Sequence, residues 1–312
     1  MSDPINNINV SYTGVVAAIV VLVILYKNCL LEMTSKNGVP LPPGPPARWF
    51  WSNALPTVRQ VIAYAFTDFV RKYGPVVSFR QGSQVIIVIG NRPFHQAAMD
   101  IMEKEGASLV DRPRSIAAGE MLSGGMRILM ARSGDRFRRL RKALATHLQP
   151  KAVQAYQEIQ RENAGNFILD LLNDPKNHQH HADRFAGSII LRVAYGKSTP
   201  TAYTDPEIVC IQNVLDHFQI AMRPGAYLVD RVPLLRYLPG YGKQLYEWHR
   251  EELQLFRQQL GRVKSEVEQS EAGPSFTKSL LENIEEHRLS TDEMSYLAGT
   301  LFGAGSDTAS CA

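Results

Sequence analysis

An uninterrupted apolar run near the amino end is the feature that most constrains how this chain folds. Residues 14–26 are apolar throughout, and the span extends over 12–31 if Lys27 lies at a membrane interface. About 20 such residues cross a bilayer, and a lysine at the edge reaches the headgroups. Only Asp3 is charged before the run, so the basic region of a cleaved signal peptide is absent. The pattern therefore predicts a tail and membrane anchor over residues 1–36, in preference to a signal peptide.

Basic residues and prolines follow the anchor. Lys27, Lys36 and Arg48 predict that the body of the protein faces the cytoplasm. The stretch VPLPPGPP at residues 39–46 lacks amide donors and has fixed φ angles, so it forms a stiff, extended connector. The same composition is also typical of a ligand for a proline-binding domain. We assign residues 37–48 to a proline-rich hinge.

Composition bounds the rest of the chain, residues 49–312. With 312 residues and 45% hydrophobic content, the chain can bury the core of one large domain or two smaller ones. The net charge of +4 favours no particular partner, and nothing indicates nucleic-acid binding. Cys29, Cys210 and Cys311 are odd in number and widely spaced, which excludes a disulfide framework and suits a reducing compartment.

Local signals predict a mainly α fold with a small β-sheet (α+β). A helix ends at Gly74–Pro75. Two β-branched runs, 76–80 and 84–89, flank a Gln-Gly-Ser turn and predict a hairpin. Residues 150–269 are expected to be mainly helical, including a charged helix over 243–268.

The last helix begins at a capping box. Ser290 stands three residues before Glu293, a spacing that satisfies orphan amides at a helix start. Along this helix an apolar face spans roughly 80° of the helical wheel and includes Gly305 and Thr308, while Asp307 points about 100° away from Thr308. Because a helical glycine costs roughly 1 kcal/mol relative to alanine, we expect Gly305 to let a ligand approach the backbone beside Thr308.

A second helix, over residues 134–148, is rich in basic residues. Arg141 lies at about 40° from Phe137, inside an apolar stripe, where a guanidinium is costly unless it meets an anion. Arg138, Lys142 and Arg139 project at roughly 100°, 140° and 200° from Phe137 and are expected to face outward. They form either an ordinary solvated face or a docking surface for an acidic partner.

Both helices resemble elements of one family. Residues 304–308, AGSDT, resemble the (A/G)-G-x-(D/E)-T element of the haem-thiolate monooxygenases, the cytochromes P-450. The basic helix resembles their W-x-x-x-R element, with Phe137 in place of tryptophan. The anchor and hinge are similar to those of microsomal members, and residues 185–196 resemble the fungal secondary-metabolism branch.

The resemblance implies a cytochrome P-450 fold that uses haem b to insert one atom of dioxygen into a small, apolar organic substrate. Ala304 and Gly305 would provide the oxygen site, and Asp307 and Thr308 would relay protons. Arg141 would bind a haem propionate beside Phe137. Electrons would come from NADPH through a flavin reductase docked on Arg138, Arg139 and Lys142, at the endoplasmic reticulum membrane, to which a single span would anchor the chain.

The family's iron ligand has no counterpart in this sequence. That cysteine lies in F-x-x-G-x-R-x-C-x-G, and none of the three cysteines fits the pattern, so no metal ligand is assigned. We therefore expect a C-terminally truncated fragment that holds haem weakly or not at all and is inactive alone. Two alternatives stay open: a non-enzymatic, membrane-bound or partner-binding remnant of such a protein, and an unrelated membrane-anchored scaffold whose basic helix binds acidic surfaces.

Overall fold

The computed structural model describes residues 16, 19, 40–46, 62–81, 84–90, 98–197, 202–223 and 225–310, without the side chains of residues 62, 63, 80, 81, 84, 307, 309 and 310. Apart from Val16 and Ile19, the predicted anchor lies outside these residues. Within them, none of the helices combines the length and the apolar character needed to cross a bilayer. Contacts divide the chain into two units, Met1–Leu109 and Val110–Ala312.

The first unit is a helix packed against a hairpin. Helix α2 (Ile62–Tyr73) precedes strands β1 (Val76–Gln81) and β2 (Gln84–Ile89), which pair antiparallel with Val76 opposite Ile89. Phe69 of α2 packs edge-on against the buried Phe79, with 4.9 Å between ring centroids. The predicted helix end and hairpin are confirmed. Two short helices, η2 (Asp100–Lys104) and α4 (Gly106–Leu109), complete this unit.

The described part of the predicted hinge, residues 40–46, forms no regular helix or strand and contacts β1. The carbonyl of Pro43 accepts a hydrogen bond of 3.0 Å from the Ser78 amide, and the Ser78 hydroxyl donates to Pro42 at 2.6 Å. A Cβ on Gly44 would lie 2.0 Å from the Ser78 carbonyl oxygen, so only glycine permits this approach. Residues 42–44 therefore lie against β1.

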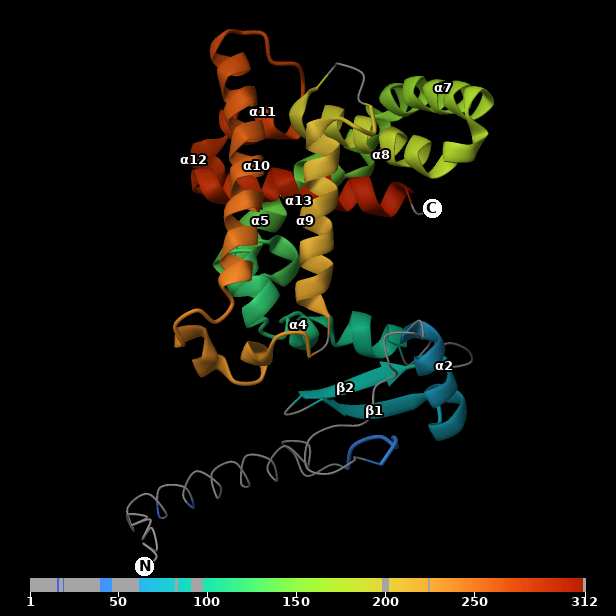
Figure 1. The fold of residues 1–312 in the computed structure, drawn as a ribbon, viewed down its shortest axis with the longest axis vertical. Helices are drawn as coiled ribbons and strands as arrows, with labels where there is room; N and C mark the ends of the chain where they lie inside the picture. The colour runs from blue at the N-terminus through green and yellow to red at the C-terminus, as the bar shows by residue number, and fades with distance from the viewer. Residues whose placement is uncertain are drawn as a thin grey trace, which may run out of the picture. The chain divides into compact units, whose positions relative to one another are not determined.

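Every regular element in the described part of the second unit is a helix. Its elements are η3 (Ile116–Leu122), η4 (Ile128–Met130), α5 (Asp135–Leu148), α6 (Pro150–Gln154), α7 (Gln157–Asn173), η5 (Pro175–Asn177), α8 (His178–Tyr195), α9 (Pro206–Met222), η6 (Leu228–Asp230), η7 (Pro233–Tyr237), α10 (Lys243–Glu268), α11 (Phe276–Glu282), α12 (Ile284–His287) and α13 (Thr291–Ser310). Figure 1 shows α13 crossing α8, α9 and α10. Its apolar side chains, including Tyr296, Leu297 and Phe302, lie in the largest core cluster.

Helix ends in this unit follow the local sequence signals. Ser290 and Glu293 form the predicted capping box, with reciprocal hydrogen bonds of 2.9 and 3.2 Å. Gly196 ends α8 at φ 69°, a left-handed conformation that favours glycine. Helix α10 has the predicted bounds.

Helix α5 has two buried sides, which corrects one sequence prediction. Leu140 and Ala143 are buried in the core, whereas Phe137 and Leu144 lie at the edge of a cavity described below. Arg139 stands next to the core side on the helical wheel. It is half-buried, and its Nε has no acceptor within the described structure. Arg139 therefore does not face outward as predicted, because the core side of α5 is not the apolar stripe seen in the sequence.

Candidate active site

A cavity of about 650 Å³ lies in the second unit, between α5, α9, α13 and the segment 112–129. Its wall is mostly apolar, and among its described lining residues there is no aspartate, glutamate or cysteine. Three arginines are therefore the charged side chains among its described lining residues. The lining residues are Arg112, Arg127, Ile128, Leu129, Phe137, Arg141, Leu144, Ala145, Leu148, Leu215, Phe218, Gln219, Thr300, Gly303, Ala304 and Thr308.

Helix α5 turns one face toward this cavity. Phe137, Arg141, Leu144 and Leu148 all line it, as their predicted positions on one stripe require. The Arg141 guanidinium carbon lies 5.7 Å from the centre of the Phe137 ring. Neither Arg141 nor Arg112 forms an ion pair with a carboxylate of the described residues. Two guanidiniums are thus available to an anion bound in the cavity.

Helix α13 contributes the hydroxyl group of Thr308 to the cavity wall. Ala304 and Thr308 lie one turn apart on the cavity wall, and the Thr308 hydroxyl donates a hydrogen bond of 2.6 Å to the Ala304 carbonyl. The structure therefore brings Ala304, Thr308, Phe137 and Arg141 to one cavity. The side chain of Asp307 lies outside the described part.

Gly305 faces a different neighbour. It is not among the lining residues, and a Cβ added there would lie 2.6 Å from Cγ1 of Ile190 on α8. The missing side chain therefore allows α13 and α8 to pack closely. Gly305 stands about 100° from Ala304 on the helix, which is why one residue faces α8 and the other faces the cavity.

A buried ion pair stands behind the cavity wall. Arg127 and Glu252 form it, and their side chains are only 5% and 2% exposed. The Tyr296 hydroxyl donates to the second Glu252 oxygen over 3.4 Å, and Nδ1 of His249 lies 2.9 Å from the same hydroxyl. Burial raises the pKa of Glu252 to about 7, although Arg127 and Tyr296 act to lower it. The network joins the cavity wall to α10 and α13.

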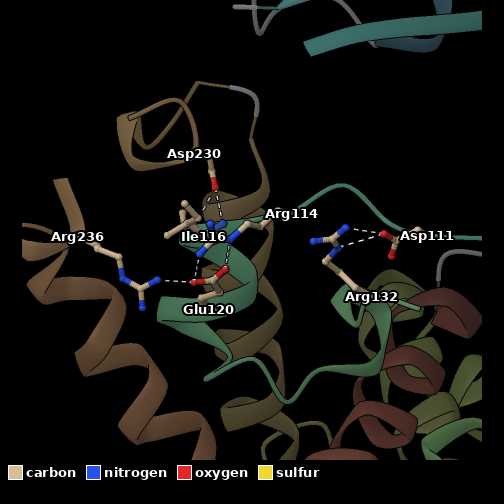
Figure 2. Close-up of polar contacts among 8 residues, drawn as sticks. Asp111, Arg114, Ile116, Glu120, Arg132, Asp230 and Arg236 are labelled. Carbon is tan, nitrogen blue, oxygen red and sulfur yellow. Dashed lines mark hydrogen bonds and ion pairs between the residues drawn. The ribbon is translucent and has the colours of Figure 1, made fainter. Parts of the chain in front are cut away.

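Two carboxylates fasten the segment 110–133 to the loop that carries η6 and η7 (Figure 2). Asp230 accepts hydrogen bonds from the amides of Ile116 and Ala117, at 2.6 and 3.1 Å, where η3 begins. Glu120 bridges two cations, Arg114 on its own segment and Arg236 on the loop, each at 2.5 Å. These bonds position η3, whose buried side chains pack against α9 and α10.

Asp111 holds the two ends of the same segment together. Its carboxylate accepts a hydrogen bond of 2.6 Å from the Arg132 guanidinium (Figure 2). It also accepts one of 2.8 Å from the Ser133 amide. These donors lower the pKa of Asp111 to about 2, so the carboxylate stays charged at all physiological pH values. We call the contacts of Asp111 with Arg132 and Ser133 the clasp. Arg112 and Arg127 lie between these residues in the chain, so the clasp helps to place both on the cavity wall.

Removal of the Asp230 carboxylate is expected to loosen η3. In Asp230→Ala the amides of Ile116 and Ala117 lose their acceptor, and their hydrogen exchange should become about tenfold faster. Amide exchange followed by mass spectrometry measures this. Glu158→Ala, which removes an exposed ion pair with Arg161 on α7, is the control and should leave both amides unchanged. Equal exchange in wild type and Asp230→Ala would refute the assignment.

Two basic residues that α5 was predicted to expose form ion pairs with carboxylates. Arg138 is exposed and pairs with Asp135, and Lys142 pairs with Glu286 of α12 at 3.0 Å. Exposed pairs of this kind contribute little to stability.

Two cavity arginines, Arg112 and Arg127, were missed by sequence reasoning. Arg112 lies in residues 111–120, which resemble a pocket-lining loop of the family but were given no named role, and Arg127 lies in no motif. A single buried arginine in a loop leaves no periodic pattern. Its partner Glu252 is 125 residues away, so only the folded chain brings the two together.

The lining residues fit the carboxylates of a haem but do not supply its iron ligand. Arg112 and Arg141 can each donate fork-like hydrogen bonds to a propionate, and the remaining wall is largely apolar. Cys210 is exposed on α9 and is not among the lining residues. Cys29 and Cys311 lie outside the described residues.

Comparison with known proteins agrees with this site. The family model for cytochrome P450 matches residues 42–312. Cytochrome P450 monooxygenase 113 of Postia placenta is 44% identical over 282 residues, which cover 90% of this chain and 56% of that protein. Cytochrome P450 monooxygenase 64 of the same fungus is 43% identical over 283 residues, covering 91% and 56%. The chain thus spans about half the length of these relatives, and it belongs to the cytochrome P450 family.

Proposed function

We propose that this chain serves a haem-dependent monooxygenase that acts on a small, mainly apolar organic substrate. The observation that carries the proposal is the single cavity in which Arg141 of α5 and the Ala304–Thr308 pair of α13 meet. Haem, when bound, supplies the activation of dioxygen. The protein supplies position, exclusion of water and protons.

Each residue has a distinct role in this proposal. Arg141 and Arg112 hold the propionates, and Phe137 packs beside Arg141. Because the Thr308 hydroxyl donates its proton to the Ala304 carbonyl, its lone pairs stay free to accept a hydrogen bond from a water in the cavity. Thr308, together with Asp307, would pass protons through such a water. Ala304, rather than Gly305, leaves the space beside Thr308, since Gly305 packs on Ile190.

Membrane and partner contacts extend the proposal. The anchor of residues 12–31 would hold the chain at the endoplasmic reticulum, facing the cytoplasm. Leu234 and Tyr237 of η7, each 75% exposed, would add a second apolar contact with the membrane surface. A flavin reductase carrying electrons from NADPH would dock at Arg138 and Lys142, whereas half-buried Arg139 contributes less.

The 312 residues alone are not expected to turn over substrate, because the described residues that line the cavity include no cysteine to ligate iron. A reduced, carbon monoxide-bound difference spectrum of the haem-loaded chain tests this. We expect no thiolate-type Soret band. Such a band would show that one of the three cysteines ligates iron and would overturn the expectation.

Arg141→Ala is expected to weaken haem binding about tenfold or more, the effect of losing one charge-assisted hydrogen bond. Titration of the chain with haem, followed by Soret absorbance, measures the affinity. Arg138→Ala is the matched control, because Arg138 lies on the same helix but pairs with Asp135 outside the cavity. If both variants bind haem as the wild type does, the propionate assignment fails.

A further inference from the structure

Among the described contacts, Arg127 is the one cavity arginine whose guanidinium is fixed by hydrogen bonds to protein partners. Its Nε donates to the Ser123 hydroxyl at 3.3 Å, and its Nη2 pairs with Glu252. Ser123 is itself tied to the Ala118 carbonyl at 2.8 Å. The guanidinium carbon lies 4.2 Å from the centre of the Phe218 ring, and Phe218 also lines the cavity.

This arrangement leaves one nitrogen of Arg127 unused. Nη1 carries two N–H donors, and no acceptor for them is found within the described structure. The side chain as a whole is only 5% exposed, yet Nη1 is not among the fully buried atoms that lack a partner, so it is reached from the cavity, where water or a ligand oxygen can accept its hydrogen bonds. Because Arg127 lines the cavity, a ligand in the cavity can provide that oxygen.

The net charge of the Arg127–Glu252 pair determines which kind of ligand oxygen binds well at Nη1. Ionised Glu252 neutralises Arg127, so the pair as a whole is neutral. A ligand carboxylate at Nη1 would stand as a second anion close to Glu252 in a water-poor site, which is costly. A carbonyl or hydroxyl oxygen accepts the same hydrogen bond without that repulsion. The arginines Arg112 and Arg141, by contrast, have no such counter-charge.

We propose that Arg127 is a specificity-determining residue whose Nη1 receives a neutral carbonyl or hydroxyl oxygen of an otherwise apolar substrate. The inference rests on the proposed function, since it names the substrate class of that cavity. Ser123, Phe218 and Glu252 keep the guanidinium in one orientation, so the oxygen fixes how the apolar skeleton lies in the cavity.

Three probes of similar shape test the proposal on the 312-residue chain without haem: adamantane, 2-adamantanone and adamantane-1-carboxylate. Dissociation constants are measured by calorimetry, or by headspace partition for the hydrocarbon, at pH 8.5, above the pKa of about 7 of Glu252. We expect the ketone to bind about tenfold more tightly than the hydrocarbon, the effect of one hydrogen bond.

Two variants assign the ketone preference to Arg127. In the double variant Arg127→Met/Glu252→Met the pair is replaced by apolar side chains of similar length, and ketone and hydrocarbon should bind equally. In Glu252→Gln the guanidinium keeps a hydrogen-bonding neighbour but loses its counter-charge, so affinity for the carboxylate should rise about tenfold over wild type. Circular dichroism checks that both variants fold.

Other polar groups of the cavity offer rival explanations that the same experiment resolves. If the ketone preference survives in the double variant but disappears in Gln219→Leu or Thr300→Val, the oxygen binds there and the proposal is wrong. An unchanged carboxylate affinity in Glu252→Gln also contradicts it. Haem titration is independent of these measurements, so loss of the proposed function and loss of this inference give different results.

Discussion

Replacing Arg127 by methionine is expected to lower the free energy of unfolding by about 3–5 kcal/mol at pH 8.5, and by much less at pH 5.5. The reason is the buried carboxylate of Glu252. At pH 8.5 this group is ionised in the wild type, and without Arg127 it must either stay charged in the core or take up a proton. At pH 5.5, below its pKa of about 7, it is already neutral, and mainly packing is lost.

Urea unfolding followed by circular dichroism at both pH values measures this difference. Arg257→Met is the control, because Arg257 makes an exposed pair with Asp292 and should cost less than about 1 kcal/mol at either pH. Adding Glu252→Met to Arg127→Met should restore most of the loss, since a buried pair can be exchanged for apolar side chains at little cost. A loss in Arg127→Met that does not depend on pH would falsify this account.

The free energy of unfolding of the wild type should also depend on pH because of Glu252. The pKa of Glu252 is higher in the folded chain, at about 7, than its ordinary value of 4.5. Its contribution to stability is therefore fully present below about pH 4.5 and is lost as the pH rises through about 7. In Glu252→Gln, the slope of unfolding free energy against pH should lack this component.

Gly299→Ala is expected to destabilise the chain by about 1–3 kcal/mol, although alanine is the better helix former. Gly299 is buried where α13 crosses α10. A Cβ there would lie 2.3–2.5 Å from three ring carbons of Phe256, a fully buried side chain. The ring cannot move without disturbing its packing against Tyr296, whose centroid lies 5.4 Å away.

Gly261→Ala provides the matched comparison for this substitution. Gly261 is an exposed residue of α10, and nothing lies within 4 Å of an added Cβ. The same substitution there should stabilise the chain by about 0.5–1 kcal/mol. Thermal unfolding of the two variants should thus shift in opposite directions. Destabilisation of similar size at both sites would mean that the contact with Phe256 is not the cause.

The parts of the fold that sequence predicts are those set by neighbouring residues. The capping box at Ser290 and the bounds of α10 both depend on contacts within a few positions. The hairpin follows from its turn and its β-branched strands. These local preferences survive folding because tertiary contacts do not oppose them.

The site was less predictable because it depends on which helix lies opposite each residue. Gly305 and Ala304 are adjacent in sequence, and only the position of Ile190 shows that Gly305 serves helix packing. Arg139 looked like a surface residue because α5 was assigned one apolar side instead of two. Glu252 stands in a helix rich in charges, where a carboxylate is ordinarily solvated, and its burial depends on Arg127.

The clasp at Asp111 has a consequence for the evolution of this protein. Because Asp111 meets Ser133 across 22 positions of chain, it closes a loop whose freedom would otherwise grow with its length. Mutations that open this loop would enlarge the set of shapes that the cavity wall samples while leaving every lining side chain unchanged. If the proposed function holds, exposed residues that never touch a substrate would change substrate range, and such positions offer a route to new specificities that leaves the cavity's own side chains intact.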